Sequence, residues 1–273
     1  MCDIDPVKWV RFAEFNRVDN KNKYDNIFEE RKGARMGYKR VILKISGEVL
    51  SGKQQRGFSK SSIRMIADEL HIAAGLCELA IVIGGGNLFR GSREGKELSL
   101  QRNVADYVGM EATILNGLIL CDALEQRGVV TRLMTAHRNE QVAEPYLYKR
   151  ALRHLEKGRV VVLAGGTGNS SVTTDSAMVI RAIELNTHVA LKGTKVDGIF
   201  DKDPEKHSDA RMIRRISHEE FGKLKLKVLD PAAVSHAGEH NITLRVFNIF
   251  EPEGNLARVL LAKEEIGSVI STE

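Results

Sequence analysis

The sequence predicts an α/β protein, a three-layer α/β/α sandwich whose central, mainly parallel sheet has about eight strands with helices on both faces. Short apolar, β-branched runs alternate along the chain with longer segments of helical periodicity, and this alternation is typical of βαβ units. Length and composition agree with this class. A chain of 273 residues with 42% hydrophobic and 28% charged side chains suits a globular protein and excludes fibrous and wholly disordered classes.

Apolar runs mark the expected strands. They are rich in Val, Ile and Leu, which is the pattern of strands buried in a parallel sheet. The runs are Val41–Ile45, Leu79–Ile83, Val129–Met134, Val160–Ala164, His188–Lys192 and Ile242–Phe247.

Segments with helical spacing lie between these runs. In Ser59–Leu76 the apolar side chains from Ile63 to Ala73 recur on one helical face, and Ser59 or Ser61 suits the N-cap. The other expected helices are Asn103–Arg127, Tyr146–Glu156 and Thr174–Leu185.

Residues 1–36 differ from the rest and are predicted to be an N-terminal extension of a single domain over residues 37–273. The first 35 residues hold 8 Lys or Arg and 7 Asp or Glu without sustained periodicity, although a short amphipathic helix is expected around Val7–Phe15. Met36 stands directly before Gly-Tyr-Lys-Arg, which leads into the first strand. Three interpretations stay open for this extension. It is a disordered appendage, a helix packed on the domain, or sequence upstream of a translation start at Met36.

Charge, cysteine content and the length of apolar runs indicate which ligands the protein binds and in which cellular compartment it lies. Lys and Arg exceed Asp and Glu by 41 to 36, and the basic residues are scattered, which does not indicate nucleic-acid binding but suits nucleotide ligands. Cys2, Cys77 and Cys121 form no C-x-x-C pattern, so we expect buried thiols rather than disulfides or a zinc site. The longest apolar runs have about five residues against roughly 18 for a membrane span, and no signal-peptide pattern precedes them. The predicted location is the cytoplasm.

Four glycine-rich loops follow predicted strands and are expected to carry the chemistry, because ligands bind at the carboxyl ends of parallel strands. The first is Lys44-Ile45-Ser46-Gly47-Glu48, and the second is Gly84-Gly85-Gly86 followed by Arg90. Glycine N–H groups beside a lysine and an arginine suit phosphate oxygens. The alternatives are a tight turn and an ordinary surface lysine.

The other two loops are Gly165–Asn169, followed by Thr173-Thr174-Asp175, and Lys192–Phe200, followed by Asp203. Four such loops at one sheet edge indicate a site for more than one phosphate group. Phosphoryl transfer needs mainly positioning and cations, which two lysines from opposite loops with a carboxylate between them would supply. The chain has no Walker sequence, no Ser-His-Asp order and no metal-ligand cluster, and its eight histidines are dispersed.

Taken in order, these motifs resemble those of bacterial-type UMP kinases, which belong to the amino-acid-kinase superfamily. The resemblance covers about residues 38–272, and the ordered series is far more specific than any single motif. The motifs are LKISGE (43–48), IGGGNLFRG (83–91), ADYVGMEATILNGL (105–118), QVAEPY (141–146), GTGN (166–169), TTDSA (173–177), KGTKVDGIF (192–200), DP (203–204) and RVFN (245–248).

The resemblance implies the amino-acid-kinase fold and transfer of the ATP γ-phosphoryl group to UMP. It also implies Mg²⁺ carried by ATP, with no metal site of the protein's own, and a homohexamer built as a trimer of dimers. The dimer contact is expected near Asn103–Arg127, where Ile114–Leu120 is apolar.

Site residues follow from the family's motifs. The implied catalytic residues are Lys44, Asp175, Lys195 and Asp230. For Asp230, the alternative is a helix N-cap before Pro231. The implied ATP-binding residues are Lys44, Ile45, Ser46, Gly47, Gly86, Arg90, Thr194, Phe200 and Asp203. The implied UMP-binding residues are Gly85, Asp106, Thr167, Gly168, Asn169, Ser170, Ser171, Val172, Thr173 and Thr174.

Two departures from the family pattern leave alternatives open. Where the family has a proline and two aromatic residues, this chain has Ser170-Ser171-Val172, and the loop 53–56 lacks the family's usual aspartate nearby. UMP affinity and regulation by GTP are therefore open. The alternatives are a superfamily kinase with another small acceptor, such as acetylglutamate, aspartate or isopentenyl phosphate, or a non-catalytic nucleotide-binding regulatory protein.

Overall fold

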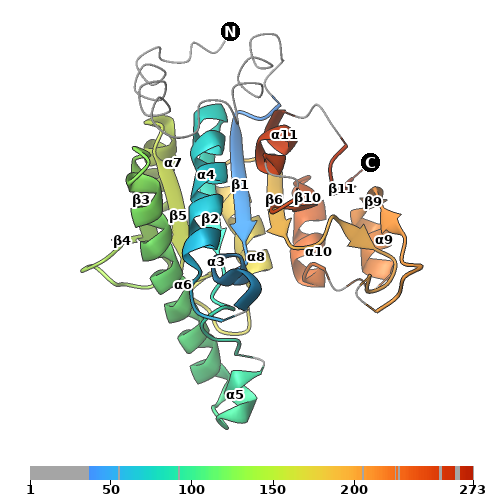
Figure 1. Ribbon diagram of the computed structural model, residues 1–273, viewed down its shortest axis with the longest axis horizontal. Helices are drawn as coiled ribbons and strands as arrows, with labels where there is room; N and C mark the ends of the chain where they lie inside the picture. Colours follow the sequence, from blue (N-terminus) through green and yellow to red (C-terminus); the bar gives the residue numbers. More distant parts are fainter. Residues whose placement is uncertain are drawn as a thin grey trace.

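The computed structural model describes residues 37–54, 56–91, 93–204, 206–224, 226, 228–251, 254–261 and 265–272. Helices lie on both sides of a central sheet (Figure 1), which confirms the predicted three-layer α/β class. The extension over residues 1–36 and the helix expected at Val7–Phe15 lie outside the described residues, so both stay predictions.

The central sheet has nine strands in the order β4-β3-β5-β2-β1-β6-β10-β11-β9. Neighbouring strands are parallel except β10 and β11, which are antiparallel. Two further strands, β7 and β8, form a separate antiparallel pair. The bounds are β1 Arg40–Ile45, β2 Glu78–Ile83, β3 Thr131–Thr135, β4 Glu144–Pro145, β5 Val160–Ala164, β6 Val189–Thr194, β7 Ile199–Phe200, β8 Met212–Ile213, β9 Arg215–Ser217, β10 Thr243–Asn248 and β11 Ser268–Ser271.

Two hydrophobic cores lie on opposite faces of this sheet because successive side chains of a strand alternate between its faces. In β1, Leu43 and Ile45 belong to the core covered by α3, α4, α6 and α11, whereas Ile42 belongs to the core covered by α7, α8, α9 and α10. The helices are α3 Glu48–Ser51, α4 Lys60–Leu76, α5 Glu94–Glu97, α6 Arg102–Glu125, α7 Tyr148–Glu156, α8 Thr174–Glu184, α9 His218–Leu224, α10 Pro231–Glu239 and α11 Asn255–Leu261, with a 3₁₀ turn at Gly52–Gln54.

Side-chain caps begin three of these helices. The hydroxyl of Ser59 accepts a bond from Ser62 N, as predicted for α4. The hydroxyl of Thr173 caps α8, and the carboxylate of Asp230 caps α10, where Pro231 takes the first helical position. The capping alternative for Asp230 is therefore confirmed.

Every strand and helix predicted within the described residues is present, with ends within two residues of those expected. The nine-stranded sheet agrees with the prediction of about eight strands. Its strands β4, β9 and β11 matched none of the predicted apolar runs, because they have only two to four residues each and carry little apolar signal. Helices α3, α5, α9 and α11 were not predicted, and for α10 only its N-cap at Asp230 was considered, since each of these helices is short and shows less than three turns of periodicity.

The long helix α6 and the cysteines fit a packed interior. In the described part of the chain, α6 alone is long and apolar enough to span a membrane by length and composition, but half of its most apolar stretch is buried against the fold. Of the two cysteines in that part, Cys121 is buried and Cys77 half-buried, and both are free thiols. Burial raises the pKa of each thiol to about 12.

Candidate active site

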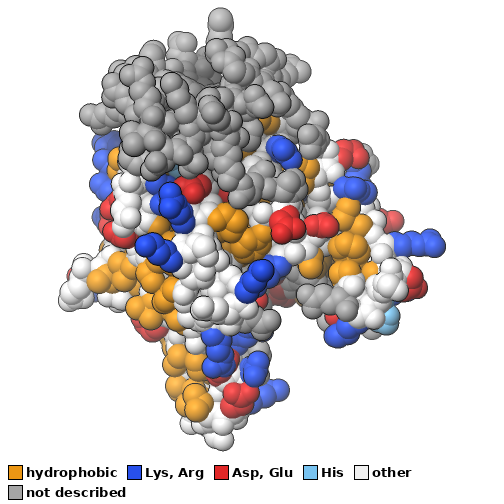
Figure 2. All heavy atoms as spheres, in the orientation of Figure 1, with side chains coloured by type: hydrophobic (Ala, Val, Ile, Leu, Met, Phe, Trp, Pro, Cys, Tyr) orange, Lys and Arg blue, Asp and Glu red, His pale blue; other side chains and the backbone are white. Residues whose placement is uncertain are grey.

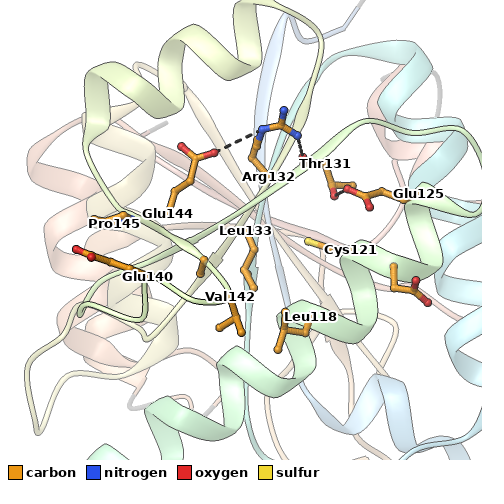
Figure 3. Close-up of a pocket in the computed structure, with 12 residues that line it drawn as sticks. Leu118, Cys121, Glu125, Thr131, Arg132, Leu133, Glu140, Val142, Glu144 and Pro145 are labelled. Atoms are coloured by element: carbon orange, nitrogen blue, oxygen red, sulfur yellow. Dashed lines mark hydrogen bonds and ion pairs between the residues drawn. The ribbon is translucent and has the colours of Figure 1, made fainter.

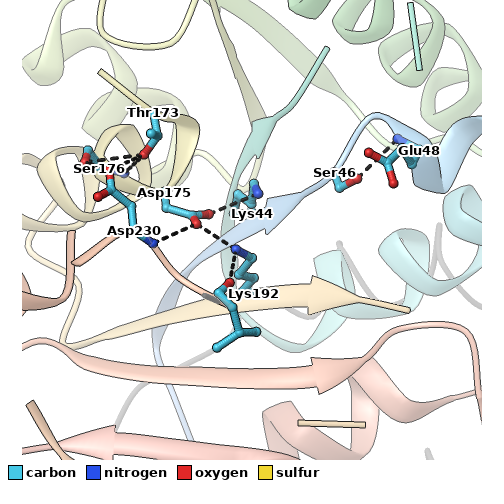
Figure 4. Close-up of polar contacts among 9 residues, drawn as sticks. Lys44, Ser46, Glu48, Thr173, Asp175, Ser176, Lys192 and Asp230 are labelled. Atoms are coloured by element: carbon cyan, nitrogen blue, oxygen red, sulfur yellow. Dashed lines mark hydrogen bonds and ion pairs between the residues drawn. The ribbon is translucent and has the colours of Figure 1, made fainter. Parts of the chain in front are cut away.

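The four glycine-rich loops meet at one edge of the sheet. They follow β5, β2, β1 and β6, which are consecutive, parallel strands. Lys44 of β1 and Lys192 of β6 are register partners, so their side chains leave the same face of the sheet side by side. Asp175 lies opposite them, in the first turn of α8 (Figure 4).

A buried charged triad results. The ammonium of Lys192 lies 2.6 Å from Asp175 Oδ2 and donates also to the carbonyl oxygen of Val228 at 2.5 Å. The ammonium of Lys44 lies 3.0 Å from Asp175 Oδ1. The three side chains are only 10–13% exposed, so these charges act in a low-dielectric setting where they are strong. The two lysines with one carboxylate between them leave a net positive charge at the sheet edge.

The pKa values of the triad reflect burial and mutual attraction. Burial by itself raises the pKa of Asp175, but the positive charges of Lys44 and then Lys192 outweigh it, so the net pKa lies below its usual 3.8. Burial, and then repulsion from Lys44, lowers the pKa of Lys192 from 10.5 to about 8 despite the attraction of Asp175. Asp175 therefore stays ionised at neutral pH, whereas Lys192 loses its proton only about one pH unit above neutral.

Lys195 does not take the position expected of the second lysine. It lies one residue beyond the end of β6, is exposed, and donates to the carbonyl oxygen of Gly52 at 3.3 Å. The sequence predicts that two lysines from opposite loops hold a carboxylate between them. Lys192, and not Lys195, makes the second of these contacts with Asp175. Sequence reasoning included Lys192 in a motif but gave it no role, because it treated the lysine as the end of a strand.

Asp230 supports the triad from the side. Its Oδ2 accepts bonds from the hydroxyls of Thr173 at 2.7 Å and Ser176 at 3.0 Å, and its Oδ1 accepts from Ala232 N. Its own backbone N–H donates to Asp175 Oδ2 at 3.4 Å. These bonds link the start of α10 to the start of α8, so Asp230 positions Asp175 through the backbone.

The first two glycine loops pack closely without unusual backbone angles. A side chain at Gly47 would lie 2.3 Å from Asn87 Oδ1, and one at Gly85 would lie 2.7 Å from the carbonyl oxygen of Gly109 in α6. Neither glycine has positive φ, so close approach is the reason for glycine here. The buried amides of Asn87 and Asn116 bond to each other in both directions, and Asn116 also donates to the carbonyl oxygen of Gly84 at 2.7 Å. Sequence reasoning missed this amide pair.

The third glycine loop does use positive φ, at Gly165, Gly166 and Gly168. Thr113 of α6, another residue that sequence reasoning missed, holds its start, because its hydroxyl accepts a bond from Gly165 N at 2.6 Å. Ser171 has φ of 64°, and its N–H donates to Asp106 Oδ2 at 2.8 Å. Asp106 thus joins α6 to the loop that departs from the family pattern.

A pocket of about 160 Å³ lies between this loop and α6. It brings together several residues predicted for UMP, namely Gly85, Asp106, Asn169, Val172 and Thr174. The remaining predicted ones, Thr167, Gly168, Ser170, Ser171 and Thr173, belong to the same loop without lining the pocket.

The residues predicted for ATP lie at the ends of β1 and β6 and in the loops that follow β1, β2 and β6. Ile45 is fully buried, so only its backbone is available to a ligand. Ser46 Oγ accepts from Glu48 N at 3.2 Å (Figure 4), and the Arg90 guanidinium is paired with the Glu48 carboxylate.

Farther along, Thr194 bonds through its hydroxyl to both backbone groups of Val196. Phe200 belongs to β7, and Asp203 forms an ion pair with Lys206 at 3.0 Å. A side chain at Gly86 would lie 3.1 Å from Glu48 Oε1.

A larger pocket, of about 570 Å³, lies between α6, β3 and β4 (Figure 3). Its lining includes the carboxylates of Asp122, Glu125, Glu140 and Glu144 against one guanidinium, that of Arg132, which lies 3.5 Å from Glu144. Such an acidic lining repels phosphate groups. The smaller pocket beside the triad is therefore the better candidate for a nucleotide.

Comparison with known proteins agrees with this geometry. Residues 39–248 match the amino acid kinase family, which is more than half of the chain. The chain belongs to this family. The family membership expected from the motifs is thus confirmed.

Solved structures of UMP kinases are similar to this amino acid kinase family member. The UMP kinase of Bacillus anthracis is 37% identical with a TM-score of 0.83, over 86% of this chain and 97% of that one. The UMP kinase of Ureaplasma parvum is 34% identical with a TM-score of 0.80, over 86% of this chain and 100% of that one. The uridylate kinase of Archaeoglobus fulgidus is 25% identical with a TM-score of 0.65, over 85% and 99%.

Proposed function

We propose that this protein is a UMP kinase, which transfers the γ-phosphoryl group of ATP to UMP and yields UDP and ADP. The observation that carries the proposal is the buried triad of Lys44, Asp175 and Lys192 at the edge where the four glycine loops meet. The chain is 34–37% identical to UMP kinases over nearly their whole length, and this similarity supports UMP as the acceptor.

In phosphoryl transfer the protein forms no covalent bond to the substrates and contributes mainly positioning and charge. An oxygen of the UMP phosphate attacks the γ-phosphorus of ATP, the bond from that phosphorus to the bridging oxygen breaks, and ADP leaves with the electron pair. Charge spreads over the transferred group as this happens. Lys44 and Lys192 lie side by side where two ammoniums can stabilise that charge, and Asp175 holds both in place.

The two nucleotides are assigned to opposite sides of the triad. We place UMP in the pocket between α6 and the loop Gly166–Thr174, with Asp106 toward its ribose. ATP is assigned to the side formed by the loops after β1, β2 and β6, with Gly47, Gly86 and Arg90 toward its phosphates. Lys195 lies on the outer part of that side.

A divalent metal fits this site only as a companion of ATP. Both oxygens of Asp175 face lysine ammoniums. Among the described residues, the one group of three His, Cys, Asp or Glu side chains close enough to share a metal ion lies elsewhere, on α10. We therefore propose that Mg²⁺ arrives on the ATP phosphates, whose charge it offsets.

An assay of ADP release tests the proposal. With ATP and Mg²⁺, we expect turnover with UMP to exceed greatly that with CMP, dUMP, acetylglutamate or aspartate. Preference for another acceptor would point to a different member of the family. No turnover with any acceptor, from folded protein that binds ATP, would favour a regulatory nucleotide-binding protein and implicate Ser170–Val172.

We also propose that the chain forms a homohexamer through dimers, with α6 in the dimer contact. The stretch Ile114–Leu120 is mostly buried in the core, but Val104, Tyr107, Val108 and Leu115 are 39–53% exposed on α6. Figure 2 shows hydrophobic side chains gathered over this helix. Light scattering should give about six chains, and Tyr107→Glu with Leu115→Glu should give smaller species. A monomeric wild-type protein would contradict this assembly.

The cytoplasmic location stays a prediction.

A further inference from the structure

A second cluster of ligand-type side chains lies at the C-terminal end of α10, at the opposite end of this helix from Asp230. It consists of His236, Glu239 and His240, and one ligand atom from each lies within 4.8 Å of the others. Positions three and four apart share one face of a helix. The prediction that the histidines are dispersed is therefore wrong for His236 and His240, which the end of α10 brings together.

The donor types select the kind of metal. Two imidazoles and one carboxylate suit Zn²⁺ and its neighbours Co²⁺ and Ni²⁺, whereas Mg²⁺ and Ca²⁺ prefer oxygen ligands throughout. Bonds of about 2.0–2.2 Å to Zn²⁺ place tetrahedral ligand atoms about 3.4 Å apart. The two imidazole rings already lie edge to face with centroids 4.9 Å apart, and Glu239 and His240 are exposed, so small side-chain rotations close the remaining gap.

The backbone beneath the cluster is fixed by packing. A side chain at Gly238 would lie 3.1 Å from His218 Cβ, so the last turn of α10 rests directly on the start of α9. His218 is itself held, because its Nε2 lies 3.1 Å from the carbonyl oxygen of Ile242. Ligands on a rigid element lose less freedom when they bind, and the C-terminal end of a helix favours a cation.

We propose that His236, Glu239 and His240 bind one divalent transition-metal ion of the Zn²⁺ class, with water completing its coordination. This site is separate from the Mg²⁺ that accompanies ATP and does not depend on the kinase activity. Its three ligands are remote in sequence from the residues assigned to either nucleotide.

Titration of the full-length, untagged protein with CoCl₂ and ZnCl₂, without nucleotide, tests the site. We expect visible absorption bands of bound Co²⁺, displaced by Zn²⁺ at about one ion per chain. His236→Ala and His240→Ala should each weaken Zn²⁺ binding at least about tenfold, which is the scale of losing a supporting group in a metal site. Glu239→Gln, which keeps both imidazoles, should weaken it less.

His207→Ala is the matched control, since His207 is also exposed but lies in another loop, and it should bind Zn²⁺ as the wild type does. If His240→Ala disturbs the helix end, His240→Asn tests the same ligand with a residue that helix ends tolerate. The proposal fails if the wild type binds no Co²⁺ or Zn²⁺, or if the double variant of His236 and His240 binds as tightly as the wild type.

Discussion

Replacing Lys192 by Met should separate what this lysine does for folding from what it does for catalysis. Its side chain is 13% exposed and lies between Asp175 and the Val228 carbonyl. Burial and the charge of Lys44 lower its pKa from 10.5 to about 8. Since one pKa unit corresponds to about 1.4 kcal/mol, keeping Lys192 charged rather than neutral inside the fold costs about 3 kcal/mol more than in the unfolded chain.

Methionine has a similar length and no charge, so it removes this cost. It also leaves the Val228 carbonyl without its donor, which costs about 1–3 kcal/mol. The two effects oppose each other, and we expect the free energy of unfolding to change by less than about 2 kcal/mol. The activity should respond quite differently. Losing one group that stabilises charge in the transition state lowers kcat/KM by about 10²–10³-fold.

Urea unfolding followed by circular dichroism, together with the ADP-release assay at pH 7, measures both effects. Asp175→Asn is the contrasting variant, because it leaves Lys44 and Lys192 facing each other without a carboxylate. That change should cost about 3–5 kcal/mol of stability. The reasoning is refuted if Lys192→Met keeps wild-type turnover, or if it destabilises the protein as much as Asp175→Asn does.

Further predictions concern pH, the acceptor and packing. Because Lys192 loses its proton near pH 8 rather than 10.5, kcat/KM for ATP should fall as pH rises through about 8, and a flat profile to pH 9.5 would contradict this. The same lowered pKa should let stability rise between pH 8 and 10.5 in urea titrations, because the unfolded chain binds more protons there. Asp106→Asn should raise KM for UMP at least tenfold with little change in KM for ATP, as steady-state kinetics can measure; an effect confined to ATP would show that UMP is placed wrongly. Gly85→Ala should destabilise the fold by about 1–3 kcal/mol through overpacking against α6, whereas Gly109→Ala, with open space around its Cβ, should not; equal urea midpoints for the two variants would refute it.

The amino-acid sequence alone predicts the main strands and helices and the loops that hold the site. Each of those signals is local: an apolar run such as Val160–Ala164 or the helical spacing in Ser59–Leu76 is written in neighbouring residues. The order of β5, β2, β1 and β6 then brings their loops to one edge. Short elements such as β4 and β9 carry too few residues for such a signal, and pairing alone makes them strands.

Which lysine joins Asp175 depends on tertiary packing. Lys192 is in register with Lys44 and so faces α8, whereas Lys195 lies past the end of β6 and reaches Gly52. Glycine loops and lysines can be counted in a sequence, but the face on which a side chain emerges depends on where its strand begins, ends and pairs. A shift of one residue reverses that face. Only the packed sheet, with α8 against it, determines which two of these ammoniums share one carboxylate.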